Sequence, residues 1–272
     1  MGITLRDAVV LVTGASGGIG SATARAFARH GANLVLTAPF EDRSILDALA
    51  AEAESFGVKT LVVPADLRDR GQIDAVVAAA VRSFGHIDVL ANIAGIGSSP
   101  ALADSTDGEL ERVLAINLLG AARAMHAVLP HMKRRGRGSI VNVGSIAGES
   151  GVMGIYSASK FGLRGLNDSV RREVRSFGIS VSLVEPGFVR TPMNAAMSGL
   201  PGPEVVADAI VRVTERPRLR TIVPRRYLFA VMLVTAFPAL TDVVFGNARI
   251  QQRLNRDARA ARAASAWNEQ PS

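Results

Sequence analysis

Short apolar runs alternate along the chain with longer segments in which apolar residues recur at helical spacing. The runs predict strands over 8–12, 33–38, 60–63, 89–93, 139–143, 180–184 and 221–223. The segments between them predict helices over 21–30, 45–56, 73–84, 109–133, 156–177 and 205–214. Strands that are apolar throughout, with helices between them, indicate a parallel sheet covered on both faces. The pattern therefore predicts a single α/β domain built on a doubly wound parallel sheet of about seven strands, with helices on both faces.

The chain divides into three parts by its composition. Residues 1–224 contain no internal repeat and no linker, so we expect one domain with an integral substrate loop. Residues 225–257 form an apolar and basic extension, with an apolar run at 227–237 that Pro238 stops and a second patch at 243–245. Residues 258–272 are rich in alanine and arginine, and we expect them to be a flexible tail.

The composition excludes several kinds of chemistry. Cysteine is absent, which removes disulfides, thiolate nucleophiles and cysteine-ligated zinc. The four histidines (30, 86, 126 and 131) are not clustered, so no metal site is expected. The formal charge of +7 belongs to residues 212–272, where eleven arginines face four acidic residues. Because the first 211 residues balance, the charge argues against nucleic-acid binding.

The sequence also predicts where the protein resides. The first residues lack the features of a signal peptide, and no apolar run reaches the roughly eighteen residues of a membrane-spanning helix. Together with the absence of cysteine, this predicts a cytoplasmic protein.

Tyr156 and Lys160 are four residues apart in a predicted helix, so their side chains share one face. A free phenol has a pKa of about 10, and a nearby ammonium lowers it because it favours the phenolate. The pair is therefore a way to build a tyrosine that exchanges a proton near neutral pH. The same spacing is common on exposed helix faces, so the surrounding motifs must decide its meaning.

Those motifs stand at the ends of the predicted strands, where doubly wound sheets bind their ligands. The loop from Thr13 to Gly20 has glycines at 14, 17, 18 and 20 and leads from the first strand into a helix. Glycines let the backbone approach a pyrophosphate closely, and a helix N-terminus offers it free N–H groups. Later strands end at Asp66, at Asn92 to Gly95, at Gly144 to Gly148, and at Pro186-Gly187 with Thr191 beyond. The arrangement predicts a nucleotide site along one edge of the sheet.

In this order the motifs resemble the short-chain dehydrogenase/reductase family, over roughly residues 5–224. The resemblance rests on the Thr-Gly-x-x-x-Gly-x-Gly loop, Asn-x-Ala-Gly, Asn117, Ser145, Tyr-x-x-x-Lys and Pro-Gly. It implies a Rossmann-like fold and an NAD(P)-dependent oxidoreductase that transfers a hydride between nicotinamide and a carbonyl or secondary alcohol. The family usually has a second asparagine where Ile93 stands, at a position that is mainly structural.

The resemblance assigns four catalytic residues. Tyr156 exchanges a proton with the substrate oxygen, and Ser145 hydrogen-bonds that oxygen. Lys160 lowers the pKa of the tyrosine and binds the nicotinamide ribose. Asn117 holds a water that links Lys160 to solvent.

The resemblance also implies a set of cofactor-binding residues. Asp66 is assigned to the adenine, Asn92 to the adenosine ribose side, and Val189 and Thr191 to the nicotinamide amide. The full set is Gly14, Ser16, Gly18, Ile19, Gly20, Thr37, Arg43, Asp66, Leu67, Asn92, Ala94, Gly95, Tyr156, Lys160, Pro186, Gly187, Val189 and Thr191.

The choice of cofactor depends on the end of the second strand. An acidic residue there would bind the ribose 2′-hydroxyl and repel a 2′-phosphate. Here Thr37 is followed by Ala38 and Pro39, no acid occurs before Glu41, and Arg43 is near enough to pair with a phosphate. The sequence predicts a preference for NADP(H), with NAD(H) as the second choice.

Several alternatives remain open. A non-catalytic dinucleotide sensor or scaffold would share the fold, although this chain retains the whole catalytic set. The 227–237 run could pack over the substrate mouth or in a subunit interface, or lie in a membrane interface with arginines facing anionic headgroups. Both arrangements place an apolar surface near the substrate loop 193–203 and predict a lipophilic steroid, retinoid or acyl-type substrate. The resemblance further implies a homodimer or homotetramer built on helices 109–133 and 156–177.

Overall fold

A computed structural model describes residues 2–97, 101–192, 197–247, 250 and 252. The expected tail at 258–272 and part of the expected substrate loop, 193–196, lie outside the described residues. Seven parallel strands form one sheet in the order β3-β2-β1-β4-β5-β6-β7. They are β1 Val9–Thr13, β2 Asn33–Thr37, β3 Thr60–Val62, β4 Val89–Asn92, β5 Gly138–Val143, β6 Ile179–Pro186 and β7 Arg220–Val223.

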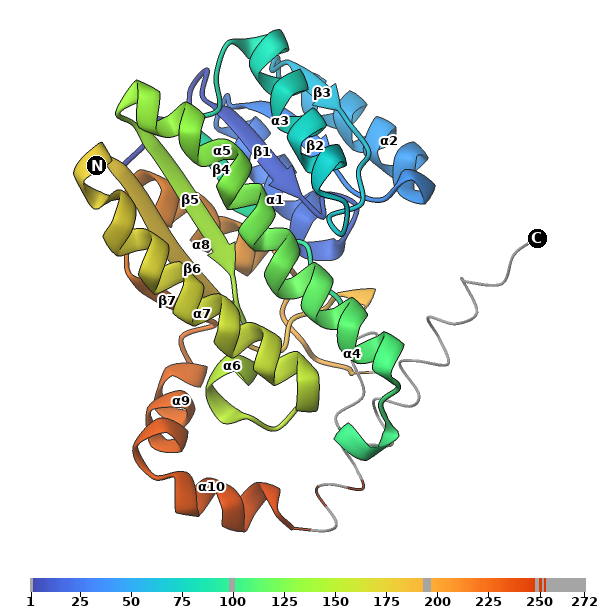
Figure 1. Cartoon of the computed structure of the whole chain (residues 1–272), viewed down its shortest axis with the longest axis vertical. Helices are drawn as coiled ribbons and strands as arrows, with labels where there is room; N and C mark the ends of the chain where they lie inside the picture. Colours follow the sequence, from blue (N-terminus) through green and yellow to red (C-terminus); the bar gives the residue numbers. More distant parts are fainter. Residues whose placement is uncertain (1, 98–100, 193–196, 248–249, 251, 253–272) are drawn as a thin grey trace.

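Helices connect the strands and cover both faces of the sheet (Figure 1). Before β7 they are α1 Gly18–Arg29, α2 Arg43–Glu54, α3 Arg70–Phe84, α4 Asp107–Leu114, α5 Ala121–Arg135, α6 Ala147–Ser150, α7 Gly154–Val174 and α8 Glu204–Glu215. Two more follow β7, α9 Tyr227–Ala236 and α10 Pro238–Phe245. The predicted fold class, a doubly wound α/β domain, is confirmed.

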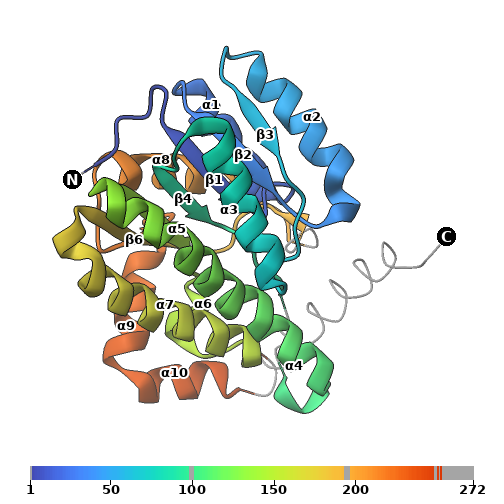
Figure 2. The ribbon, with the colours of Figure 1, turned by 45° about the horizontal axis from the view of Figure 1, so that its top comes forward.

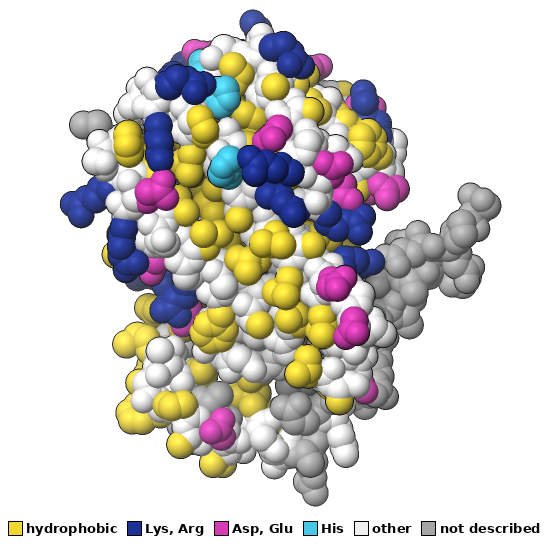
Figure 3. All heavy atoms as spheres, in the orientation of Figure 1, with side chains coloured by type: hydrophobic (Ala, Val, Ile, Leu, Met, Phe, Trp, Pro, Cys, Tyr) yellow, Lys and Arg dark blue, Asp and Glu magenta, His cyan; other side chains and the backbone are white. Residues whose placement is uncertain are grey.

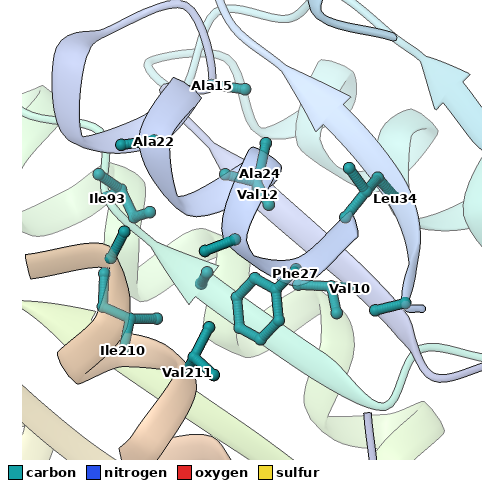
Figure 4. Packing of buried hydrophobic residues seen from close by; sticks show 14 of the residues in the cluster. Val10, Val12, Ala15, Ala22, Ala24, Phe27, Leu34, Ile93, Ile210 and Val211 are labelled. Carbon is teal, nitrogen blue, oxygen red and sulfur yellow. The ribbon is translucent and has the colours of Figure 1, made fainter. Parts of the chain in front are cut away.

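The core forms two layers, one on each face of the sheet. Helices α1, α2 and α8 bury apolar residues against one face, and α3, α5 and α7 against the other (Figure 2). On the first face, Phe27 of α1 is fully buried beside Val10 of β1 and Val211 of α8 (Figure 4). Ile93 belongs to the same layer, so the residue that departs from the family pattern fills the core.

The sheet order places a topological switch between β1 and β4, because the chain runs outward from β1 to β3 and then returns to the other side of β1. Val10 of β1 pairs with Leu34 of β2 on one side and with Val89 of β4 on the other. Loops at the carboxyl ends of β1 and β4 therefore diverge and leave room for a ligand.

The long helix predicted over 109–133 is continuous from Asp107 to Arg135, but its middle is a π-helical turn, Ala115–Gly120. By length and composition alone this 29-residue helix, which contains an 18-residue window with a mean hydropathy of 1.4, could cross a membrane, which the apolar runs in the sequence had not suggested. Its buried residues pack on the sheet beside α3 and α7, and this position in the core accounts for the apolar composition of the helix.

Other boundaries differ in instructive ways. Helix α1 begins at Gly18, three residues before the predicted start. The prediction began too late because two glycines, which are poor helix formers, occupy the first turn. Pro238 ends one helix and begins the next, since proline at a first helical position needs no N–H partner. A short helix, α6, which the pattern did not predict, lies between β5 and α7.

Candidate active site

Ser145, Tyr156 and Lys160 meet just beyond the end of β5. Ser145 lies between β5 and α6, and its hydroxyl hydrogen-bonds to the Tyr156 phenol at the start of α7. Lys160 lies one turn further along α7, with Nζ 5.8 Å from the centre of the Tyr156 ring. The lysine Nζ donates to the Val143 carbonyl oxygen at 3.0 Å, which fixes it at the end of β5.

Asn117 approaches Lys160 from the π-helical turn between α4 and α5. Its Oδ1 accepts from the Ile96 N–H at 2.8 Å, and its Nδ2 donates to the Ile96 carbonyl at 2.9 Å and to Ser159 Oγ at 3.1 Å. A Cβ on Gly95 would lie 3.2 Å from both Asn117 Oδ1 and Lys160 Nζ. Gly95 therefore leaves open the space between the amide and the ammonium.

The π-helical turn explains how a residue inside a long helix reaches the site. A π turn widens the helix and displaces its backbone, and such turns often occur at functional sites. Asn117 lies within this turn and is fully buried, and its side chain is satisfied by the strand-end loop and by α7. The poor helix propensity of asparagine is the only sequence signal for this departure.

Burial governs the two titrating groups. It raises the pKa of Tyr156, and the hydrogen bond from Ser145 offsets part of that rise. Burial also lowers the pKa of Lys160 to about 8. The Lys160 ammonium, which the resemblance expects to lower the tyrosine pKa, is held by the Val143 carbonyl oxygen.

The glycine loop after β1 is shaped for close backbone approach. Gly14 has a φ of 65°, and a Cβ there would lie 2.7 Å from Ala94 Cα. A Cβ on Gly20 would lie 2.0 Å from the Gly14 carbonyl oxygen. The first turn of α1 has no side-chain cap and no acidic residue, so its N–H groups and positive dipole end suit a pyrophosphate.

A family model described as short chain dehydrogenase matches residues 8–199, which contain the loop, the asparagine, the serine and the tyrosine–lysine pair. The chain belongs to the short-chain dehydrogenase/reductase family. It is therefore an oxidoreductase of that family, and the resemblance seen in the sequence is confirmed.

Known members cover most of this dehydrogenase. A ketoacyl reductase from Nostoc sp. is 36% identical over 230 residues, 81% of this chain and 79% of that protein. A trans-4-hydroxycyclohexanecarboxylate dehydrogenase from Sinomonas cyclohexanicum is 37% identical over 198 residues, 70% of this chain and 76% of that protein. A short-chain dehydrogenase/reductase from Burkholderia phymatum, solved in complex with NAD, superposes with a TM-score of 0.81 at 26% identity, covering 88% of this chain and 96% of that one.

The groups beyond β2 differ from the simple picture given by the sequence. Thr37 is buried, and its hydroxyl has no hydrogen-bond partner among the described residues. Arg43 is exposed and paired with Asp47 through a 2.9 Å contact. Asp42, which the sequence had not singled out, accepts a hydrogen bond from Ser16 at 2.6 Å. An acidic group therefore reaches the glycine loop of this dehydrogenase from a short helix after β2.

Two residues assigned to the adenosine have other partners. Asp66 is paired with Arg68 at 2.6 Å, and the side-chain hydrogen bond from Arg68 holds its pKa below the usual range. Asn92 is buried and donates to the Ala121 carbonyl at 3.1 Å and to Asn142 Oδ1 at 2.9 Å. The Asn92 side chain thus joins β4 to α5 and β5 instead of facing the glycine loop. Its contact with the ribose side of the adenosine stays a prediction.

The remaining predicted residues lie along the same edge of the sheet. Ala94 faces Gly14, and a Cβ on Gly18 would lie 3.3 Å from Thr191 Cγ2. Leu67 packs on Gly120 at the end of the π turn, and Val189 is buried in the core. Pro186 accepts from the Ile146 N–H at 3.0 Å, whereas the Tyr227 ring covers Gly187. Ser16 and Ile19 are part of the loop and first turn described above.

Sequence reasoning missed one further link. Thr13 Oγ1 accepts from the N–H groups of Ile93 and Ala94 at 3.0 and 3.3 Å. This hydroxyl ties the glycine loop to the Asn-x-Ala-Gly segment across the switch point. Its position as the last residue of the first strand was the available signal.

Proposed function

We propose that this dehydrogenase interconverts a secondary alcohol and the corresponding ketone of a lipophilic substrate, using Ser145, Tyr156, Lys160 and Asn117. The observation that carries the proposal is the Ser145–Tyr156 hydrogen bond, with Lys160 one turn away and the glycine loop across the switch point. A nicotinamide dinucleotide bound along this edge supplies the hydride donor or acceptor. The glycine cradle and the uncapped first turn of α1 fit its pyrophosphate.

The residues of the chain supply position and the proton. In the reducing direction, the substrate carbonyl carbon accepts the hydride while its oxygen accepts the Tyr156 proton, with Ser145 donating to that oxygen. Lys160 orients the ribose and favours the phenolate that remains. Asn117, held by Ile96 and Ser159, keeps the space beside Lys160 Nζ open to a water.

A turnover screen with both cofactors tests the proposal, over steroids, retinoids, acyl thioesters, sugars and small ketones. Reversible hydride transfer to one lipophilic class would support it. Tight binding of reduced cofactor, followed by its fluorescence, with no turnover of any carbonyl would favour a dinucleotide sensor. A small hydrophilic sugar as best substrate would contradict the lipophilic assignment.

The lipophilic assignment is supported by α9 and its neighbours. Helix α9 packs on α6, the short helix that follows Ser145 in the sequence, and Tyr227 packs on Gly187. It is apolar on all sides, yet Phe229 and Met232 are 76% and 61% exposed. One of the relatives is named a ketoacyl reductase, which favours an acyl-type compound.

We also propose a preference for NADP(H), with Arg43 as the partner of the 2′-phosphate and Asp42 as the group that limits the preference. Arg43→Ala is expected to lower kcat/KM with NADP(H) about tenfold and to leave NAD(H) unchanged, because a charge-assisted hydrogen bond is lost. Asp42→Asn is expected to raise kcat/KM with NADP(H) several-fold, since it removes a repelling carboxylate next to Ser16.

Steady-state kinetics with both cofactors measure the two effects. Arg172→Ala, an exposed arginine on α7, is the matched control and should leave the ratio unchanged. Better use of NAD(H) by the unmodified protein, or no response of the ratio to Arg43→Ala, would overturn the preference.

We propose that the protein is cytoplasmic and touches anionic membranes through α9 and α10. Apolar side chains gather over these helices (Figure 3), with Phe237 and Val243 59% and 74% exposed. Arg216, Arg218 and the pair Arg225–Arg226 are exposed in the segment before α9. Apolar residues flanked by arginines suit the headgroup boundary of an anionic bilayer.

Sedimentation with vesicles containing phosphatidylserine checks this surface. The intact protein should pellet at low salt and much less at high salt, and a Phe229→Ser/Met232→Ser variant should bind about a hundredfold more weakly. Ile45→Ser, on the remote helix α2, is the control, since Ile45 is also exposed. If the protein does not pellet with vesicles at low salt, the membrane proposal fails and α9 and α10 are expected to pack against protein. Sedimentation without vesicles then gives the number of subunits.

Self-association is proposed on the face formed by α4, α5 and α7. Leu119 and Phe161 are 46% and 43% exposed, and a Cβ on Gly162 would lie 3.0 Å from Leu118 Cδ2. Figure 3 shows a band of apolar side chains over these helices. This face supports a homodimer or homotetramer and is separate from α9.

A further inference from the structure

Two buried glutamates share one arginine behind the turn that carries Ser145. The side chains of Glu149 on α6 and Glu185 on β6 are each 1% exposed. Arg220 of β7 forms ion pairs with both: its Nη2 lies 2.8 Å from Glu149 Oε1, and its Nε donates to Glu185 Oε2. Arg164 of α7 also contacts Glu149 Oε1, at 2.5 Å. The cluster therefore joins four elements, with two carboxylates facing two guanidinium groups.

The cluster contacts the backbone both before and after Ser145. Gly144 precedes the serine, and a Cβ there would lie 3.1 Å from Glu185 Cγ. After the serine, the Ala147 N–H donates to Ser145 Oγ at 3.1 Å and begins α6, which carries Glu149. A Cβ on Gly148 would lie 3.0 Å from the Lys160 carbonyl carbon. A shift of either carboxylate thus moves the backbone next to Ser145 and Lys160.

The two carboxyl groups also interact with each other. Burial raises the pKa of Glu185 to about 7; Arg220 opposes the rise, and Glu149 adds to it. Glu149 Oε2 has no hydrogen-bond partner among the described residues. A protonated Glu185 can donate to Glu149, whereas two carboxylates in contact repel each other. Near neutral pH, one proton thus decides whether the glutamates attract or repel.

Two guanidinium groups face this pair. The charged partners are Arg220 and Arg164, and they come from β7 and α7. Helix α9 lies over Arg220 and lines a cavity there with Leu228, Val231, Met232, Thr235 and Ala236, which carry no charge. The response to pH is therefore expected to come from Glu185, whose pKa lies near neutral pH.

We propose that Glu149, Glu185 and Arg220 are positioning residues that set the hydrogen bond between Ser145 and Tyr156, and that the proton between the glutamates tightens this turn. The consequence for catalysis rests on the proposed function. The consequence for the Ser145–Tyr156 geometry does not, so the two can be tested apart.

The test observes Tyr156 directly. The chain has two tyrosines, so a Tyr227→Phe background leaves Tyr156 as the only one. With tyrosine isotope-labelled at the ring carbon that bears the hydroxyl, its NMR signal reports the hydrogen bond from Ser145. The signal should shift between about pH 6 and about pH 8, as Glu185 loses its proton. Glu185→Gln should abolish the shift, because the amide cannot titrate.

Matched variants separate positioning from general stability. Glu173→Gln, which removes an exposed carboxylate paired with Lys133, should leave the pH-dependent shift intact. Arg220→Lys retains a charge but cannot hold both glutamates with the same fork, so it should move the signal at all pH values. Where turnover is measurable, Arg220→Lys should lower kcat about tenfold with cofactor Kd within about twofold of wild type.

A Tyr156 signal that is independent of pH, or a shift that persists in Glu185→Gln, would overturn the proposal. So would an unchanged signal in Arg220→Lys, even if the melting temperature fell, because the cluster would then serve stability alone. If the signal behaves as expected and no carbonyl is turned over, the positioning role stands and the proposed function fails.

Discussion

Tyr156→Phe is expected to lose nearly all turnover, on the order of a thousandfold in kcat, while cofactor still binds. The reason is that the phenol hydroxyl carries the proton and also bonds to Ser145, and positioned proton transfer is worth about a hundred- to ten-thousandfold. The ring remains, so the packing at the start of α7 and the cofactor edge should persist. Steady-state kcat and a fluorescence titration with reduced cofactor measure the two quantities.

Tyr227→Phe provides the matched control, since it removes the hydroxyl from the only other tyrosine. Its ring packs on Gly187 near the site, and turnover should stay close to wild type because that packing is preserved. Wild-type turnover by Tyr156→Phe across the pH range would show that another group supplies the proton.

Lys160→Ala should damage both turnover and cofactor affinity, with kcat/KM lower by on the order of a thousandfold. The ammonium is buried, bonds the Val143 carbonyl and faces the gap beside Gly95, where it orients the ribose under the proposed mechanism. Loss of a buried charge-assisted hydrogen bond should weaken cofactor binding about tenfold or more. Kinetics and direct cofactor titration separate the two losses.

The same variant tests the pKa of the lysine through stability. Burial lowers the Lys160 pKa from 10.5 to about 8, so between those values the unfolded chain binds more protons than the folded one. The free energy of unfolding should therefore rise with pH across that window in the wild type, by on the order of 3 kcal/mol. Below about pH 8 the cost of burying the ammonium is fully present. Lys160→Ala should lack this rise.

Lys133→Ala is the control for both measurements, because Lys133 is paired with Glu173 at the far end of α5. It should change neither cofactor affinity nor the stability slope above pH 8. An equal loss in Lys133→Ala, or a wild-type slope that survives in Lys160→Ala, would contradict the role given to Lys160.

Much of the fold could be predicted because the strands are buried on both faces. Val10, Leu34 and Leu90 belong to short runs without polar interruption, and such runs occur in parallel sheets. The glycine loop and the Tyr156–Lys160 spacing were also readable, since each is local in sequence. A spacing of four residues places Tyr156 and Lys160 on one face of a helix. The positions of the other motifs at the strand ends follow from the topology.

What could not be predicted depends on contacts between distant segments. The Ser16–Asp42 hydrogen bond spans 26 residues, and the sequence shows Asp42 only as one of several charges after β2. Glu149, Glu185 and Arg220 belong to three elements and meet only after β6 and β7 have paired. The π turn at Asn117 adds no residue pattern of its own, because a helical period reads through it.

The order of the strands has a consequence for folding. Strand β1 pairs on one side with β2 and on the other with β4, whose residues lie about eighty positions along the chain, as in Val10 with Val89. Such a pairing closes a long loop before any contact rewards it, which slows folding. The pairing of β1 with β4 cannot form in a nascent chain that ends before residue 89. Such a fragment has the glycine loop but lacks the segment after β4 that packs against it. Cofactor should therefore bind this dehydrogenase only after β4 and the loop that follows it have been synthesised, and it then acts as a ligand that stabilises the finished fold.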